Sequence, residues 1–202
     1  MIRCVISDLG KVLIFFDNSI FYRKLAAFTS FDVKEIAARV NVHSEIGQAF
    51  DTGRLSPQAF YKKAIEVLEA ELSCEDFFAM YNDVFSLNRP VVDILSRLKA
   101  LSCRMVMLSN TDVERFGFIR DRFPEVMLFD GYVLSYEEGY IKPDPRIFEV
   151  ALGKAEAFPD ECVFIDDRSE NVEAARRLGI HTIHFLEDSN LRSALIELGL
   201  EP

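Results

Sequence analysis

The feature that most constrains this chain is the alternation of short apolar runs with longer segments of helical periodicity. The runs are rich in β-branched residues and contain few polar interruptions, which is typical of strands buried on both faces. They are RCVIS (3–7), CRMVML (103–108), GYVLS (131–135), CVFID (162–166) and HTIHFL (181–186). Strands that alternate with helices form a mostly parallel sheet with right-handed crossovers. The sequence therefore predicts an α/β fold with helices on both faces of the sheet.

Three of the segments between these runs carry an apolar face at helical spacing. The first is RPVVDILSRLKAL (89–101), and PRIFEVALGKA (145–155) and SENVEAARRLG (169–179) repeat its pattern. Gly179 is expected to end the last of these helices, because glycine readily adopts the left-handed conformation that closes many helices. These three helices are expected to pack on the sheet.

The interval 17–87 breaks the alternation. It contains no recognisable strand, only helical patterns such as SIFYRKLAAF, VKEIAARV and SPQAFYKKAIEVLEAEL. Ser56 and Pro57 favour a helix start, as N-cap and first-turn residue. An interval of this length is too long for a simple crossover, so we expect a helical cap at 17–87, inserted into a core made of 1–16 and 88–202. Phenylalanines at helical spacing are expected to fill the interior of the cap, and they include Phe21, Phe28, Phe50 and Phe60.

Composition and charge exclude several classes of function. Half of the 202 residues are hydrophobic and the net charge is −10, so a basic surface that binds nucleic acid is not expected. The longest wholly apolar run, VLIFF, is far shorter than the ~20 residues of a membrane-spanning helix. The first residues also lack the pattern of a signal peptide. We therefore expect a cytoplasmic protein without nucleic-acid or membrane partners, present as a monomer or a homodimer.

Cysteine and histidine do not form a recognisable site. The cysteines are widely spaced and mostly lie in or beside apolar runs, so we expect free thiols at Cys4, Cys74, Cys103 and Cys162. The histidines lack the spacing of metal ligands, so we expect structural roles for His43, His181 and His184.

Polar residues follow four of the predicted strands, where the ligand crevice of an open parallel sheet lies. Each is unremarkable alone, because an acidic residue after a strand often caps the next helix. Together they bring a carboxylate, a hydroxyl, an amine and a pair of carboxylates to one edge of the sheet. This set is typical of phosphoryl transfer. In chain order the residues are Asp8, Ser109 with Asn110 and Thr111, Lys142, and Asp166 with Asp167 and Asn171.

The chemistry of phosphate ester hydrolysis suggests a role for each group. The Asp8 carboxylate could attack phosphorus and form an aspartyl-phosphate, which water then cleaves. Mg²⁺ prefers carboxylate ligands, so Asp8, Asp167 and Asp166 form a candidate metal site. Ser109 can donate a hydrogen bond to a phosphoryl oxygen, and Lys142 supplies a fixed positive charge.

These residues lie in motifs that resemble the four ordered motifs of the haloacid dehalogenase-like hydrolase superfamily. The motifs are DLGKV, LSNT, GYIKPDPRIF and FIDDRSENVEAARRLGI, so the resemblance covers essentially the whole chain. FDTGRLSPQAF also resembles a cap segment of sugar-phosphatase-like members, such as the bacterial glucose-1-phosphatases. The resemblance implies a Rossmann-like core, a helical cap, Mg²⁺ dependence and a small phosphorylated substrate such as a sugar phosphate.

The resemblance also implies roles for individual residues. Asp8 would be the nucleophile and a metal ligand, and Ser109 with Asn110 would bind the phosphate. Lys142 would stabilise negative charge. Asp167 would bind the metal, with Asp166 and Asn171 in support.

The first motif departs from the superfamily pattern DxDx(T/V) at Gly10. The aspartate usual at this position protonates the leaving oxygen and later activates water, while its carbonyl binds Mg²⁺. Gly10 keeps the carbonyl and loses an acid–base group, which is typically worth ~10²–10⁴-fold in rate. The resemblance includes a DLGxV subgroup whose members are still regarded as phosphatases. Asp17, Asp112, a cap residue or water could replace the acid.

Lys11 and two alternative functions stay open at this point. Lys11 either binds substrate beside the nucleophile or points away from the site. A 2-haloacid dehalogenase also uses an aspartate nucleophile, but it needs no metal, and the Asp166–Asp167 pair counts against it. A catalytically impaired scaffold that only binds a ligand is the second alternative, because of Gly10. The sequence favours a Mg²⁺-dependent phosphatase.

Overall fold

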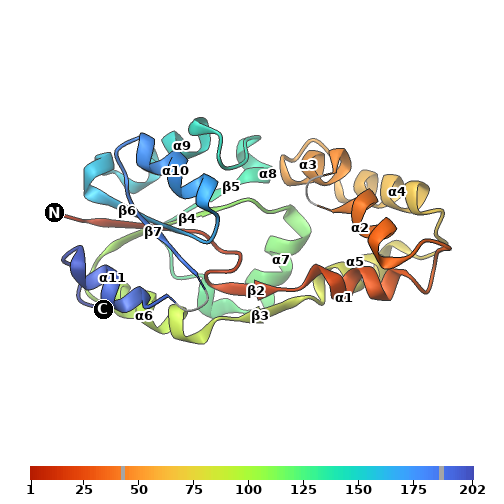
Figure 1. The fold of residues 1–202 in the computed structure, drawn as a ribbon, viewed down its shortest axis with the longest axis horizontal. Coiled ribbons are helices and arrows are strands. Elements are labelled where there is room, and N and C mark those ends of the chain that lie inside the picture. Colours follow the sequence, from red (N-terminus) through yellow and green to blue (C-terminus); the bar gives the residue numbers. More distant parts are fainter. Residues whose placement is uncertain (42–43, 187–188) are drawn as a thin grey trace.

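The structure is a computed structural model, and it describes residues 1–41, 44–186 and 189–202. Figure 1 shows a sheet covered by helices at one end of the molecule and a group of helices at the other. Among the described residues, the large sheet has five parallel strands in the order β5-β4-β1-β6-β7. They are β1 (Cys4–Ser7), β4 (Arg104–Ser109), β5 (Gly131–Leu134), β6 (Cys162–Asp166) and β7 (His181–His184). The five predicted strands and the α/β class are confirmed.

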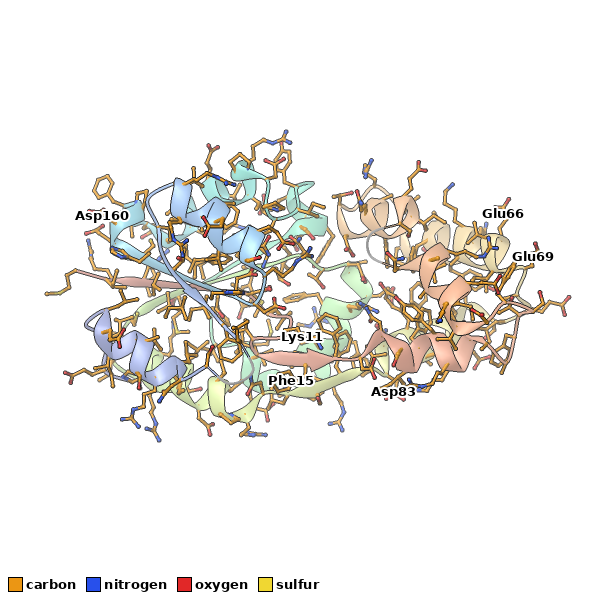
Figure 2. The ribbon with its side chains drawn as sticks, in the orientation of Figure 1. Lys11, Phe15, Glu66, Glu69, Asp83 and Asp160 are labelled. Atoms are coloured by element: carbon orange, nitrogen blue, oxygen red, sulfur yellow. The ribbon has the colours of Figure 1, made fainter. Side chains whose placement is uncertain are left out.

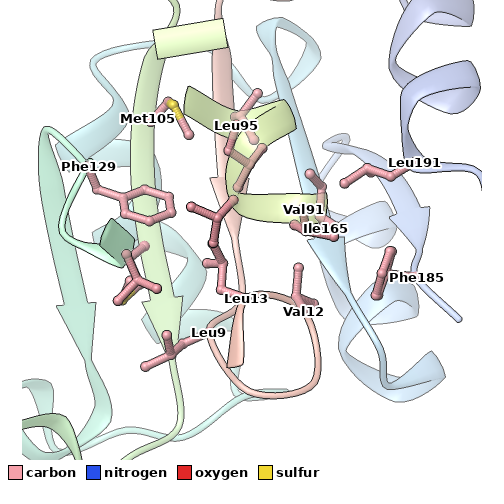
Figure 3. Packing of buried hydrophobic residues seen from close by; sticks show 14 of the residues in the cluster. Leu9, Val12, Leu13, Val91, Leu95, Met105, Phe129, Ile165, Phe185 and Leu191 are labelled. Atoms are coloured by element: carbon pink, nitrogen blue, oxygen red, sulfur yellow. The ribbon is translucent and has the colours of Figure 1, made fainter. Parts of the chain in front are cut away.

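Helices cover both faces of this sheet, as the apolar runs predict. One face packs on α9 (Pro145–Ala155) and α10 (Ser169–Arg177), and the other on α6 (Arg89–Ala100), α7 (Val113–Arg122) and α11 (Leu191–Glu197). Figure 3 shows the second of these layers, where side chains of the loop after β1 pack between the sheet and α6. The shorter elements are α8 (Ser135–Glu138) and the 3-10 turns η1 (Pro124–Val126) and η2 (Pro159–Glu161).

The loop after β1 is fixed by its own apolar residues. Leu9, Val12 and Leu13 are buried in the core cluster seen in Figure 3, so the backbone between them cannot move freely. Asp8 and Gly10 project from this anchored loop at the carboxyl end of β1. The central position of β1 places Asp8 between the ends of β4 and β6.

The interval 17–87 forms a helical group with an interior of its own. Its helices are α1 (Asn18–Leu25), α2 (Val33–Val40), α3 (Glu45–Asp51), α4 (Pro57–Leu68) and α5 (Cys74–Asn82). The expected start of α4 is confirmed, since the Ser56 hydroxyl accepts from the Ala59 N–H at 3.2 Å. Phe21, Phe50 and Phe60 lie in the interior as expected. Phe28 does not, because it lies in the turn after α1 and is 39% exposed.

A short ribbon joins this group to the sheet part. Strand β2 (Ile14–Phe16) pairs in antiparallel fashion with β3 (Phe85–Leu87), so the two chain crossings run side by side. The expectation of no strand within 17–87 is therefore wrong at its last residues. A strand of three residues carries no periodicity, and its partner is distant in sequence. The proposed boundaries of the core (1–16 and 88–202) and cap (17–87) fall at this ribbon, and the division stays a prediction.

The remaining sequence expectations concern thiols, imidazoles and membranes. All four cysteines are free. His43 lies outside the described residues, while His181 and His184 are exposed on β7, and the His184 Nε2 atom lies 2.9 Å from the Asp167 carbonyl oxygen. Within the part of the chain that the structure describes, no helix combines the length and hydropathy needed to cross a bilayer.

Candidate active site

The polar residues at the strand ends converge on one cavity of about 300 Å³, which lies between the sheet and the helical group. The order of the strands explains the convergence, because β1 lies directly between β4 and β6 and all three run in the same direction. Ten of the residues that the sequence singled out line this cavity: Asp8, Gly10, Lys11, Ser109, Asn110, Thr111, Asp112, Lys142, Asp167 and Asn171.

Lys142 is the buried cation of this site. Its Nζ atom lies 2.8 Å from Asp8 Oδ1 and 2.7 Å from Asp166 Oδ2, and it donates to the Leu108 carbonyl at 2.9 Å. Burial would lower the pKa of Lys142, but the charges of Asp166 and Asp8 outweigh burial and raise it. Lys142 therefore stays charged and holds the two carboxylates in fixed positions.

Asp8 is the candidate nucleophile, and its carboxylate is held by two contacts. Its Oδ1 atom accepts from the Leu9 N–H at 2.7 Å in addition to its contact with Lys142. Burial raises the pKa of Asp8 to about 7, and Lys142 opposes this while Asp166 adds to it. Without a further cation, the protein alone does not fully stabilise the charged form of Asp8.

Three carboxylates lie close enough to share a metal ion. Oxygens of Asp8, Asp166 and Asp167 all lie within 4.8 Å of one another. Burial, followed by the charge of Asp166, also raises the pKa of Asp167. Three acids therefore face one ammonium, and a divalent cation would restore the balance of charge. Oxygen donors at this separation fit a hard ion such as Mg²⁺.

The carboxylates of Asp166 and Asp167 differ in how many hydrogen bonds they accept. Asp166 is fully buried, and it accepts from the Arg168 N–H at 2.9 Å and from Asn171 Nδ2 at 2.9 and 3.1 Å, besides Lys142. Asp167 lines the cavity, and its carboxylate accepts no hydrogen bond from another described residue. The Oδ1 atom of Asn171 is buried without a partner. Asp166 therefore positions the group, and Asp167 is the more available ligand.

The side chains of Ser109 and Asn110, at and after the end of β4, make different contacts. Ser109 lines the cavity, and its hydroxyl bonds to no other described residue, so it is free to meet a phosphate. Asn110 instead clasps the backbone of Lys142: its Nδ2 donates to the Lys142 carbonyl at 3.0 Å, and its Oδ1 accepts from the Lys142 N–H at 2.8 Å. The Asn110 side chain thus fixes the loop that carries Lys142, and its expected contact with phosphate stays a prediction.

Phe16 lies against both Gly10 and Lys11. A Cβ atom at Gly10 would lie 3.0 Å from Phe16 Cε1, so a larger residue there requires the ring to shift. Lys11 has a φ of 60°, and its Nζ donates to the Phe16 carbonyl at 2.6 Å and lies 4.7 Å from the ring centroid. Figure 2 places Lys11 near the middle of the molecule, where the two parts meet. Lys11 therefore lines the cavity, and its amine already donates one hydrogen bond, to the Phe16 carbonyl oxygen.

A second polar cluster beside the cavity is centred on Asp112 and Arg115 at the start of α7. Asp112 caps α7 and accepts from the Glu114 and Arg115 N–H groups at 3.0 and 2.9 Å, and from the Tyr81 hydroxyl at 2.7 Å. The Arg115 guanidinium lies 4.0 Å from the Tyr81 ring centroid and donates to Asn18 Oδ1 at 2.8 Å. Its Nε atom has no hydrogen-bond partner among the described residues and lies 4.0 Å from Asp112 Oδ2. Sequence reasoning named Asp112 as a candidate acid but did not single out Arg115.

Asp51, at the end of α3, joins this cluster from the helical group and was also missed. It lines the cavity together with Asp112 and Arg115. Burial raises the pKa of Asp51 to about 7, with a further contribution from Asp112 and an opposing one from Arg115. The only sequence signal was its place in the segment FDTGRLSPQAF.

The corner after Asp51 docks tightly on the sheet part, where Figure 1 shows α3 beside α8. Ser135 Oγ lies 2.6 Å from the Asp51 carbonyl oxygen and 2.9 Å from that of Thr111, and it accepts from the Thr111 N–H at 2.9 Å. Gly53 has a φ of +67°, and a Cβ atom there would lie 2.2 Å from the Tyr136 carbonyl oxygen. Only glycine fits this contact.

Replacement of Gly53 by alanine is therefore expected to destabilise the protein by about 1–3 kcal/mol, since it adds both backbone strain and a clash. Urea unfolding measures this loss. Gly117→Ala on α7 is the matched control, because its Cβ would meet no atom within 4 Å. The control should be neutral or stabilising by up to about 1 kcal/mol. Equal stability of Gly53→Ala and wild type would contradict the docking described.

Comparison with known proteins places this site in context. A family model described as haloacid dehalogenase-like hydrolase matches residues 2–179. A sesquiterpene phosphatase of Aspergillus oryzae is 26% identical over 188 residues, which span 92% of this chain and 90% of that protein. A D-ribitol-5-phosphate phosphatase of Bacteroides thetaiotaomicron is 26% identical over 194 residues, covering 90% of this chain and 91% of the relative.

A solved structure resembles the whole molecule. It is a haloacid dehalogenase family enzyme of Bacteroides thetaiotaomicron in complex with magnesium and inorganic phosphate. The superposition has a TM-score of 0.83 at 25% identity, and it covers 96% of this chain and 99% of that one. The similarity thus extends over both the sheet and the inserted helices.

Proposed function

This chain belongs to the haloacid dehalogenase-like hydrolase family, and from this premise we propose that it is a Mg²⁺-dependent phosphatase of small phosphorylated metabolites. The observation that carries the proposal is the meeting of Asp8, Ser109, Lys142 and Asp167 in one cavity. Hydrolysis of a phosphate ester requires a nucleophile, a hydrogen-bond donor to the phosphoryl oxygens, a cation and a carboxylate that can bind a metal ion. Relatives named as phosphatases support the same reaction.

The reaction proposed has two steps. An Asp8 oxygen attacks phosphorus, the ester P–O bond breaks, and the leaving oxygen takes up a proton and departs as an alcohol. Water then attacks the phosphorus of the aspartyl-phosphate, which releases phosphate and restores Asp8. Lys142 aims Asp8 through the 2.8 Å contact, and the free hydroxyl of Ser109 donates to a phosphoryl oxygen.

The carboxylate cluster fits the magnesium ion proposed for the reaction. Asp8, Asp167 and the carbonyl of Gly10 would hold it, while Asp166 and Asn171 position the ligands. The bound ion would neutralise charge on the phosphoryl oxygens and on Asp8. An acidic protein needs such local neutralisation, because its net charge of −10 repels an anionic substrate.

A sugar phosphate is the substrate class we propose within this function. Asp51 of the helical group and Arg115 of α7 both line the cavity, and their polar groups can bind hydroxyls. Phe16 and Phe85 supply apolar surface for a ring or chain. The relative that acts on ribitol 5-phosphate, a phosphorylated polyol, supports this class.

A panel of phosphorylated sugars and polyols, assayed for phosphate release, tests the proposal. We expect release with Mg²⁺, loss of release with EDTA, and recovery when Mg²⁺ is returned, since the three carboxylates need a cation to act together. A parallel assay of halide release from chloroacetate should be negative. Halide release without metal would instead identify a dehalogenase. Ligand binding without turnover on any substrate would identify an impaired scaffold.

A further inference from the structure

The departing oxygen of an alkyl phosphate needs a proton, and Gly10 has no side chain to give one. Among the described residues, four carboxyl groups line the cavity, those of Asp8, Asp51, Asp112 and Asp167. Asp8 and Asp167 belong to the cluster that faces Lys142 and the proposed metal. The proton donor must therefore be sought on the opposite side of the cavity.

Two acids that the sequence suggested as proton donors, Asp112 and Asp17, have other roles in the structure. Asp112 accepts three hydrogen bonds, from Glu114, Arg115 and Tyr81, so its oxygens are already used to cap α7 and bind α5. Asp17 is an exposed N-cap of α1 that accepts from the Ser19 N–H at 2.9 Å, and it does not line the cavity.

Asp51 is the remaining acid, and its surroundings suit a proton donor. Asp51 lines the cavity, and its carboxyl group accepts no hydrogen bond from another described residue. The charged and titratable groups around it are Asp112 and Arg115 of α7 and Tyr81 of α5. Its backbone is tied to the loop after β4 through Ser135, so the acid is held beside the strand end that carries Ser109.

We propose that Asp51 is the acid–base residue of this enzyme and replaces the group that Gly10 lacks. The proposal rests on the phosphatase function proposed above. As the bond from Asp8 to phosphorus forms and the ester P–O bond breaks, the Asp51 carboxyl group gives its proton to the leaving oxygen. The products of this step are an alcohol, the aspartyl-phosphate and the Asp51 carboxylate.

The second step restores Asp51. Its carboxylate takes a proton from the water that attacks the aspartyl-phosphate, which yields inorganic phosphate and free Asp8. Burial and the neighbouring charge of Asp112 raise the pKa of Asp51 to about 7, so it can hold and release a proton near neutral pH. A cap residue of this kind acts only when the helical group is docked on the sheet part.

The test compares leaving groups in Asp51→Asn. Benzyl phosphate has a strongly basic leaving oxygen, whereas 4-nitrophenyl phosphate releases a stable anion that needs no proton. We expect the first-turnover rate with benzyl phosphate to fall by ~10²–10⁴-fold, as general acid catalysis is lost. First-turnover release of nitrophenol should be largely unchanged, which also verifies that the variant is folded. Asp51→Glu, which keeps the acid, should restore much of the benzyl phosphate rate.

Controls separate this inference from the function on which it rests. Glu45→Gln removes an exposed acid from the same helix and should leave both rates unchanged. Equal losses on both substrates in Asp51→Asn, or no loss on either, would overturn the role of Asp51. Full activity of Asp8→Asn would overturn the phosphatase proposal itself, whatever the Asp51 variants do.

Discussion

Asp8→Asn is expected to lower turnover on every phosphate ester by at least about 10⁴-fold, because an amide cannot form the acyl phosphate. The protein should remain folded. Burial already disfavours the charged form of Asp8, as its raised pKa of about 7 indicates, so removing the charge costs little in the metal-free protein. Phosphate release with saturating Mg²⁺ measures the first effect, and thermal unfolding in EDTA measures the second.

The stability measurement makes the activity result informative. An unfolding midpoint at or above that of wild type, together with lost turnover, would assign the loss to chemistry. A midpoint far below that of wild type would mean that Asp8 supports the fold, and the loss of activity would then say nothing about a nucleophile. Retained turnover would be incompatible with an aspartyl-phosphate on Asp8.

Lys142→Met is expected to have the largest combined effect. Its Nζ is buried and contacts Asp8 and Asp166 at 2.8 and 2.7 Å, so methionine leaves two buried carboxylates without their cation. Breaking a buried ion pair from one side typically costs about 3–5 kcal/mol. Turnover should also fall by at least about 10²-fold, since Asp8 loses the group that aims it. Urea unfolding in EDTA measures the stability, and phosphate release measures the turnover.

A second variant checks the cause of this instability. Adding Asp8→Asn to Lys142→Met removes one of the unpaired carboxylates, so part of the lost stability should return. Strict additivity of the two changes would mean that the contact between Lys142 and Asp8 contributes nothing to the stability that Lys142→Met loses. Excess Mg²⁺ should also stabilise Lys142→Met, because the cation would compensate the charges of Asp8, Asp166 and Asp167.

Much of the site could be predicted because its residues follow strands. The carboxyl ends of parallel strands meet at one edge, so the sequence predicts that Asp8, Ser109 and Asp167 lie close together. The side-chain contacts were harder to predict. The Asn110 side chain holds the backbone of Lys142, which the sequence did not predict, while its expected contact with phosphate stays a prediction. Residue type and position do not determine which hydrogen bonds a side chain will make.

The sequence alone determined the α/β class, the five strands, the helical insertion and the candidate nucleophile, because each rests on local periodicity or on residues at strand ends. Tertiary structure decided what surrounds Gly10. It placed Phe16 against that glycine, paired β2 with β3, and docked Gly53 on Tyr136 so that Asp51 reaches the cavity. The pairing of β2 with β3 and the contact of Gly53 with Tyr136 join residues distant in sequence, and their geometry depends on how the helical group packs against the sheet. No pattern along the chain encodes that packing.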